Sequence, residues 1–430
     1  MSTSSADSSV WRNWSGSQSS RPAAWLQPQD EADLARLVGR TQGEIRVTGA
    51  GHSFTPLCAT TGTLVSIDRL QGIASHDART QQADIWAGTR LHDLGEPLWA
   101  CGQSLINQGD IDQQSLAGAC GTGTHGTGRT LQSLSAQVRG VRLVTPAGDI
   151  IAADAQHDSE VWRAVSVSLG ALGIVSQIRM QNRARYSLSI REFSMPRAEA
   201  LGRLAQLARD NRHAESFIFF ESERAIVKLI NETDAAPTAR PWFELPESAV
   251  LNLTSRLAHG LPGLSGPMQK LLTSLHSEVK RTDQAWRIFP SAREARFNEM
   301  EYEIPAERGP ECAQEIIDTV RRSGLRTLFP LEYRFVAADD VWLSPCFGRD
   351  NVAISVHQHV CTDYRPLFNL VEPIFWKYGG RPHWGKLHTL DARRLAELYP
   401  HWDDYRRVRE RLDPQGRMLN DHLRRLLVLP

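Results

Sequence analysis

The stretch Val47–Phe54, with the sequence VTGAGHSF, places three small residues, Gly49, Ala50 and Gly51, directly before His52. Small residues leave the backbone bare, so a flat ring or a phosphate can approach it closely. Taken alone, a histidine after glycine is more often a loop or capping residue than a cofactor ligand. The interpretation of this stretch therefore depends on the other motifs of the chain.

A second glycine-rich stretch, NQGDIDQQSLAGACGTGTHGTG, follows at residues 107–128. Within it, residues 121–126 match the G-x-G-x-x-G pattern of dinucleotide-binding turns. That pattern is specific only between a hydrophobic strand and a helix, and neither flanks it clearly here. The glycines favour a bare loop whose N–H groups can approach a phosphate; a merely flexible loop is the alternative.

The sequence GRPHWGK at residues 380–386 fits the G-x-x-x-x-G-K pattern of phosphate-binding loops. Pro382 removes an N–H group that such a loop needs, and Leu387 stands where a magnesium-binding hydroxyl is required. An NTPase is therefore excluded. Lys386 either acts on a bound ligand or is an ordinary surface lysine.

Composition limits the possible partners and the location of the protein. Among the 430 residues, Lys plus Arg and Asp plus Glu both total 49, so no net charge favours nucleic acid. The six cysteines are scattered without a C-x-x-C pair, which favours free thiols and a cytoplasmic location. No apolar run approaches the roughly 18 residues that an integral membrane span requires. The serine-rich residues 1–20 are predicted to be a disordered start.

The hydrophobic pattern predicts an α+β protein. Short β-rich runs alternate with helical stretches over residues 22–182, including a helix at 91–101 with Leu91, Leu94 and Leu98 on one face. Beyond Tyr186, runs of strands and helices favour a sheet covered by helices. The Pro-, Gly- and Ser-rich stretch 233–277 gives no clear prediction. In this second half, strands are expected at 186–195, 216–222, 224–231, 331–337 and 351–360, and helices at 198–209, 311–324 and 364–380.

Five motifs in order resemble a family of flavoproteins. VTGAGHSF, the loop at 107–128 and SLGALGIV at 168–175 are similar to the FAD-binding half of the vanillyl-alcohol-oxidase family. EYRFVAADDVWLSPCFGRD at 332–350 and RPHWGK at 381–386 resemble its aldonolactone and alditol oxidoreductase branch. The resemblance covers most of the chain and is far more specific than either glycine motif alone.

The resemblance implies a two-domain fold. Residues 21–182 are expected to form a PCMH-type FAD-binding domain, and residues 183–405 a substrate or cap domain. The cap domain should be built on an antiparallel sheet covered by helices. Residues 406–430 are expected to pack back toward the FAD domain.

The resemblance also implies the cofactor and its contacts. FAD is expected, with His52 joined covalently to the 8α-methyl group of the flavin. His125 is either a second flavin neighbour or a packed loop histidine. The expected cofactor contacts are Gly49, Ala50, Gly51, His52, Ser53, Ser115, Gly118, Gly121, Thr122, His125, Ile174 and Val175.

Alternation along the strand LEYRFV places Glu332 and Arg334 on the same face. In most strands such a pair is exposed and structural, whereas a buried pair must bind something or pair with each other. The resemblance implies that these two residues bind substrate over the flavin, together with Lys386. Arg334 and Lys386 would stabilise negative charge during hydride transfer, while Glu332 orients substrate hydroxyls.

Two departures from the alditol branch bear on the substrate. Asp110 and His357 stand where that branch has serine and threonine, which favours a sugar 1,4-lactone of the arabinono, gulono or galactono type. Oxygen or another molecule would accept the electrons. An alditol or polyol oxidase producing hydrogen peroxide and a non-catalytic flavoprotein are the alternatives. His357 and His359 share a strand face, but no third ligand has a suitable spacing, so no metal is expected.

Overall fold

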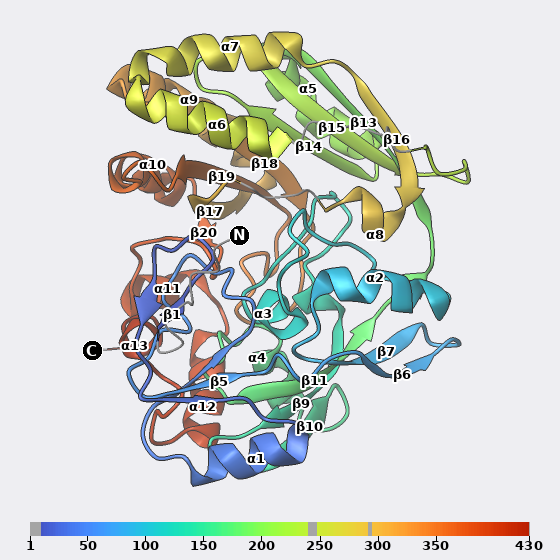
Figure 1. The fold of residues 1–430 in the computed structure, drawn as a ribbon, viewed down its shortest axis with the longest axis vertical. Coiled ribbons are helices and arrows are strands. Elements are labelled where there is room, and N and C mark those ends of the chain that lie inside the picture. Colours follow the sequence, from blue (N-terminus) through green and yellow to red (C-terminus); the bar gives the residue numbers. More distant parts are fainter. Residues whose placement is uncertain (1–9, 240–246, 291–294, 430) are drawn as a thin grey trace, which may run out of the picture.

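A computed structural model describes residues 10–239, 247–290 and 295–429. The chain forms a lower part, residues 24–181, beneath a large sheet that carries helices on its outer side (Figure 1). This arrangement confirms the predicted α+β class.

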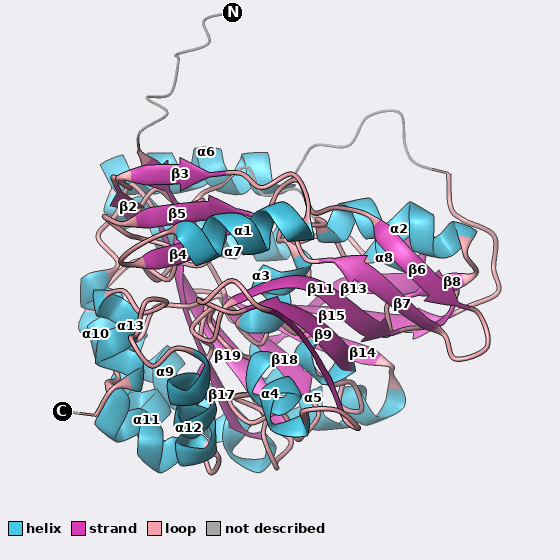
Figure 2. Cartoon of the chain, turned by 90° about the horizontal axis from the view of Figure 1, so that it is seen from below, coloured by secondary structure: helices cyan, strands magenta, loops and turns pink. Residues whose placement is uncertain are grey.

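The lower part contains two sheets. The first is a parallel three-stranded sheet of order β3-β5-β4 (Figure 2), and the second is an antiparallel five-stranded sheet of order β10-β9-β11-β7-β6. Leu34, Ile45, Val65, Val144 and Ile174 pack in one core that joins them. The strands are β3 (Ala24–Leu26), β4 (Ile45–Thr48), β5 (Thr63–Ser66), β6 (Ile73–Asp77), β7 (Gln82–Trp86), β9 (Val138–Val144), β10 (Ile150–Asp154) and β11 (Ile174–Gln181).

Helices of the lower part follow their sequence signals. The helix α1 (Glu31–Arg40) starts at Asp30, whose side chain accepts a hydrogen bond from the Asp33 N–H. The helix α2 (Leu91–Ala100) buries Leu91, Leu94 and Leu98, which confirms the predicted apolar face. Two short helices, α3 (Leu116–Gly121) and α4 (Ser159–Val165), complete this part.

The upper sheet is antiparallel, with eight strands in the order β16-β13-β15-β14-β18-β19-β17-β20. Helices cover its outer face, and its inner face is turned toward the lower part (Figure 1). This confirms the expected antiparallel sheet covered by helices. The strands are β13 (Ser187–Pro196), β14 (His213–Ile218), β15 (Arg224–Glu232), β16 (Val279–Gln284), β17 (Phe297–Pro305), β18 (Leu331–Val336), β19 (Asn351–His359) and β20 (Arg381–Pro382); the helices are α5 (Arg197–Asp210), α6 (Glu247–Gly260), α7 (Ser265–Leu275), α8 (Ala285–Ile288), α9 (Gly309–Ser323) and α10 (Arg365–Lys377).

The last helices of the chain contact the lower part. They are α11 (Ala392–Leu398), α12 (Trp402–Leu412) and α13 (Asp421–Leu427). The Tyr405 hydroxyl donates to the Ser168 carbonyl at 2.9 Å, and the buried Arg46 guanidinium donates to the Met418 carbonyl. Met418 is itself part of the core between the two lower sheets.

The prediction of a disordered start is wrong for residues 11–20. There β1 (Trp11–Arg12) pairs with β2 (Ser19–Ser20), and the Trp11 indole N–H donates to the Thr48 hydroxyl at 3.1 Å. Trp11 is buried, and burying one large aromatic side chain offsets the ordering of a short polar hairpin. Residues 1–9 lie outside the described residues.

Several elements of the chain were not predicted. The stretch 233–277 contains α6 and α7, and its residues 240–246 lie outside the described residues. The strands β16 and β17 were not predicted either. None of the helices in the described residues combines the length and apolarity needed to cross a bilayer.

Candidate functional site

A first cavity lies in the lower part, where the loop after β4, the start of α3 and the corner before β11 meet. These are the three regions that carry the first three sequence motifs. Of the expected cofactor contacts, the cavity is lined by Gly49, Ala50, Gly51, His52, Ser53, Ser115, Gly118, Gly121, Thr122 and Val175.

The backbone at this cavity is packed too tightly for side chains. A Cβ atom on Gly49 would lie 2.1 Å from the Ser115 hydroxyl oxygen, and Gly51 has a φ of +67°. The Ser115 hydroxyl is buried and has no hydrogen-bond partner among the residues that the structure describes. A buried polar group without a partner at a cavity wall indicates that a polar ligand completes it. The wall therefore fits a bound phosphate-containing cofactor.

His52 is positioned by an aromatic neighbour. Its ring stacks on Trp14 with a centroid separation of 5.5 Å. Burial and the charges of Lys386 and Arg90 lower the pKa of His52 to about 4. The imidazole is therefore neutral at physiological pH, with a nitrogen lone pair at the cavity wall.

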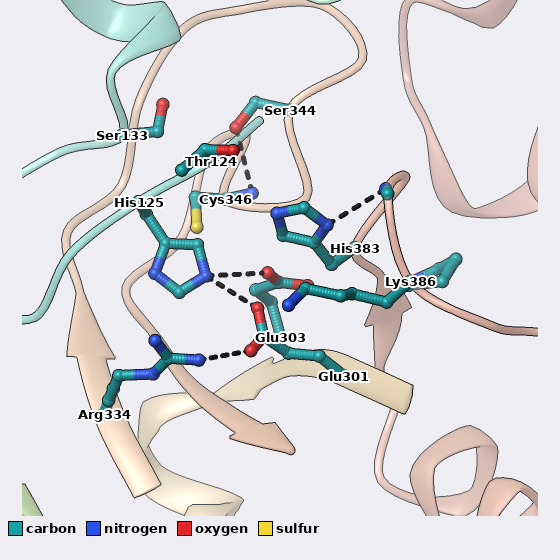
Figure 3. Close-up of polar contacts among 12 residues, drawn as sticks. Thr124, His125, Ser133, Glu301, Glu303, Arg334, Ser344, Cys346, His383 and Lys386 are labelled. Carbon is teal, nitrogen blue, oxygen red and sulfur yellow. Dashed lines mark hydrogen bonds and ion pairs between the residues drawn. The ribbon is translucent and has the colours of Figure 1, made fainter. Parts of the chain in front are cut away.

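Two expected cofactor contacts do not line the first cavity. Ile174 is buried in the core between the lower sheets, and the next residue of β11, Val175, faces the cavity instead, because side chains alternate along a strand. His125 lies beneath the upper sheet, where its Nε2 faces both Glu301 and Glu303 (Figure 3). The structure thus places His125 at a second cavity.

The second cavity lies between the inner face of the upper sheet and the loop at residues 109–125. It shares Gln114 with the first cavity, so the two are neighbours. It brings together Asp110, His125, Glu332, Arg334, His357 and Lys386. The remaining lining residues are Gly109, Ile111, Gln114, Thr124, Phe297, Glu299, Glu301 and His383.

Arg334 and Lys386 are held by glutamates of β17. Arg334 donates to the Glu301 carboxylate, and its guanidinium also lies 3.4 Å from a Glu332 oxygen. The Lys386 ammonium donates to Glu299. Burial lowers the pKa of Arg334, but the charges of Glu301 and Glu332 outweigh that effect and raise it above its ordinary value. The second cavity therefore holds a fixed guanidinium beside a fixed ammonium.

The sequence analysis missed Glu299, Glu301 and Glu303, which point toward the lower part from alternate positions of β17. Burial raises the pKa of Glu301, but Arg334 and His125 lower it well below its ordinary value. For Glu303, burial raises the pKa. The alternation in NEMEYEIP was the available signal, because buried acids at every second position require cationic partners.

One ring nitrogen of His125 contacts two of these glutamates. Its Nε2 lies 2.9 Å from a Glu301 oxygen and 3.3 Å from a Glu303 oxygen. Burial lowers the pKa of His125, but the bond to Glu301 and its charge raise the pKa to about 9. At neutral pH His125 is therefore a buried imidazolium.

A set with the chemistry of metal ligands also lies here. Ligand atoms of His125, Glu301 and His383 are within 4.8 Å of one another, the one such group among the described residues. Glu301 is already bonded to Arg334 and His125, and Nδ1 of His383 accepts from the Gly385 N–H at 3.0 Å. We interpret the set as a hydrogen-bond network because neighbouring cations compete with a metal for its carboxylate.

Asp110 reaches the second cavity from the loop at 109–125. Its carboxylate lies 3.6 Å from the Lys228 ammonium, which lies 2.6 Å from a Glu215 oxygen. Lys228 and Glu215 are paired across β15 and β14, and Glu215 is paired with Arg334 across β14 and β18. Charges of alternating sign therefore run across the sheet to Arg334. Lys228 and Glu215 were also missed from the sequence.

Comparisons with known families decide the class of this site. Residues 22–154 match an FAD binding domain, and residues 178–426 match the D-arabinono-1,4-lactone oxidase family. The chain belongs to the D-arabinono-1,4-lactone oxidase family. It is an FAD-dependent oxidoreductase, as the resemblance of the sequence motifs implied.

Similar proteins extend over the whole chain. The L-gulono-1,4-lactone dehydrogenase of Mycobacterium tuberculosis is 38% identical over 98% of this chain and 99% of its own length. The alditol oxidase of a Streptomyces species is 28% identical over 96% of this chain and 98% of its own. Among solved structures, cholesterol oxidase from Brevibacterium sterolicum superposes with a TM-score of 0.81 at 16% identity, covering 97% of this chain and 96% of its own. That last likeness shows the shared fold.

Proposed function

We propose that this chain oxidises a sugar 1,4-lactone of the arabinono, gulono or galactono type. The observation that carries the proposal is the convergence of Glu332, Arg334 and Lys386 in a cavity that shares Gln114 with the glycine-lined cavity. Residues 21–182 would bind FAD and residues 183–405 the substrate, with residues 406–430 packed back on the FAD domain. Oxygen or another acceptor would take the electrons.

FAD is assigned to the first cavity. The unpartnered Ser115 hydroxyl and the bare backbone at Gly49 support this placement. His52 is proposed as the covalent attachment point, since its neutral imidazole has a lone pair at the cavity wall. The remaining proposed contacts are Ala50, Gly51, Ser53, Gly118, Gly121, Thr122 and Val175, whereas the placement of Ile174 and His125 supports a packing role for both.

Bound FAD supplies a hydride acceptor at flavin N5. Arg334 and Lys386 hold positive charge where the substrate oxygen becomes negative as the carbon–hydrogen bond breaks. Glu332, 3.4 Å from Arg334, is free to accept hydrogen bonds from substrate hydroxyls and so to orient the sugar ring. Each of the two cations is balanced by a glutamate of β17, which suits a neutral substrate.

Asp110 and His357 are proposed to bind the substrate. Both line the second cavity, one from the loop at 109–125 and one from β19. Relatives named as lactone dehydrogenases and lactone oxidases support a lactone. The Streptomyces alditol oxidase, which is 28% identical, is the observation that favours an alditol or polyol as the second candidate substrate.

A substrate panel tests the proposal. Lactones and alditols are each supplied with oxygen, where peroxide is measured, and then with an artificial electron acceptor. Turnover of one or more 1,4-lactones in preference to xylitol and other alditols is expected. Peroxide formed from xylitol but not from lactones would contradict the lactone proposal and show that the substrate is an alditol.

The cellular location remains a prediction from composition. The six cysteines are all free, and three of them, Cys120, Cys312 and Cys346, are buried. Free thiols persist in a reducing compartment, so we propose a cytoplasmic location.

A further inference from the structure

The proposed oxidation releases a proton as well as a hydride, and the second cavity offers several groups to receive it. An alcohol becomes a carbonyl only when its O–H proton leaves, and the acceptor must lie at the cavity and be unprotonated beforehand. The hydrogen bonds of each candidate group show whether it meets this requirement. The inference rests on the proposed function.

Three nitrogen bases of the cavity are unsuitable. His125 already carries its proton, since the pKa is raised to about 9 by Glu301 despite burial. Nδ1 of His383 accepts from the Gly385 N–H, so its other ring nitrogen carries the hydrogen. Lys386 is the donor in its bond to Glu299.

The carboxylates of β17 are also poor acceptors. Burial raises the pKa of Glu299, but the charge of Lys386 leads the effects that lower it to about 2. Glu301 has a pKa well below the ordinary value for the same kind of reason, in its case because of Arg334 and His125. Carboxylates paired with buried cations hold a proton only weakly at neutral pH.

His357 has the required geometry. Its Nδ1 lies 3.3 Å from the Pro330 carbonyl, an acceptor only, so a neutral His357 ring is assigned its hydrogen on Nδ1 and its lone pair on Nε2. The rings of Phe297 and Phe329 pack against the imidazole at centroid distances of 5.0 and 5.9 Å. The ring is 3% exposed and lines the second cavity, so it is held rigidly.

Two carboxylates lie on the Nε2 side of the ring. Nε2 lies 3.4 Å from a Glu299 oxygen on β17 and 4.0 Å from a Glu332 oxygen on β18. The Lys386 ammonium opposes them, but it is bonded to Glu299. A proton taken up at Nε2 would lie near these two carboxylates, which attract positive charge.

We propose that Nε2 of His357 is the proton acceptor of the oxidation. The substrate O–H bond breaks and the proton forms an N–H bond at Nε2. The adjacent C–H bond breaks and its hydride, with both electrons, passes to the flavin, while the carbon–oxygen bond becomes a carbonyl. The alcohol is oxidised by two electrons, and the imidazolium later returns its proton to water.

The rate of anaerobic flavin reduction against pH is the first test. Because His357 must be neutral to accept a proton, the rate should fall on the acid side with a single ionisation. His357→Asn should slow flavin reduction about 100-fold or more and abolish that acid limb. His359→Asn is the matched control, since His359 lies two residues along β19, bonds to Asn252 and does not line the cavity.

Glu332→Gln separates this proposal from its nearest rival. If His357→Asn retains the acid limb while Glu332→Gln loses it, the proton goes to Glu332 and the proposal is wrong. If no lactone or alditol reduces the flavin of the wild-type protein, the proposed function itself is wrong. That result differs from a variant that still reduces its flavin but no longer slows at acid pH.

A second test needs no turnover. In protein labelled with ¹⁵N-histidine, the signals lost in His357→Asn identify this ring in the wild-type spectrum. At a pH where the ring is neutral, we expect the hydrogen on Nδ1 and an unprotonated Nε2. The opposite tautomer, with hydrogen on Nε2, would overturn the proposal even if the Asn variant were unstable.

Discussion

The covalent attachment of the cofactor is proposed to depend on a single residue, His52. A neutral histidine at the wall of the glycine-lined cavity has the chemistry for a covalent bond to the flavin. We expect denatured wild-type protein to keep flavin fluorescence in a gel and His52→Ala to lose it. A dark wild-type band would contradict the covalent bond while leaving FAD binding possible.

Arg334 and Lys386 are predicted to act on the reaction and not on cofactor binding. Neither lines the first cavity, so Arg334→Ala and Lys386→Ala should retain FAD. Each should slow anaerobic flavin reduction roughly 10²–10³-fold, the usual cost of removing a group that stabilises developing charge. Lys377→Ala, which removes an exposed lysine bonded to Glu315, is the control and should reduce normally. An unchanged rate in the first two variants would contradict their assignment.

At the scale of the element, β17 links the cations of the second cavity into one network. Glu301 bonds to both Arg334 and His125, whereas burial raises the pKa of Glu303. Glu301→Gln should therefore destabilise the fold by about 3–5 kcal/mol, because it leaves buried cations without their carboxylate. Burial already disfavours the charge of Glu303, so Glu303→Gln, which keeps the shape of the side chain, should cost much less. Equal losses in urea unfolding would contradict the assigned charges.

His125 makes the stability of this network depend on pH. Its pKa is about 9 in the folded chain against 6.5 as the ordinary value, so the folded state binds the proton more tightly. The stabilisation is complete below about pH 6.5 and is lost as the pH rises through about 9. It amounts to on the order of 3 kcal/mol. Urea unfolding from pH 6 to 10 should show this loss in wild type and not in His125→Asn.

Some strands and helices could be predicted from the sequence, and others could not. The face shared by Glu332 and Arg334 followed from alternation along β18, and the apolar face of α2 from helical spacing. The strand β17 was not predicted because both of its faces are buried and one carries acids, so it lacks the alternation of apolar and polar residues that marks a half-exposed strand. The helix α7 was not predicted because the residues that it buries are polar: Ser265, Gln269 and Thr273.

For the whole molecule, the five ordered motifs predicted the family, the cofactor and the two-part architecture. They converge because the loop after β4, the loop at 109–125 and the inner face of the upper sheet meet at two neighbouring cavities. The alternation of acids in β17 could have drawn attention to Glu299, Glu301 and Glu303, but their partners could not be predicted because they lie far away in the sequence. The buried Trp11 was missed because it lies among serines.

The most direct test of the whole account is the absorption spectrum of the purified protein under anaerobic conditions. The account predicts a yellow protein whose flavin absorption band in the blue region of the spectrum bleaches when a sugar 1,4-lactone is added. In Arg334→Ala the same band should bleach far more slowly. A flavin band that no 1,4-lactone bleaches, or one that bleaches equally fast without Arg334, would contradict it.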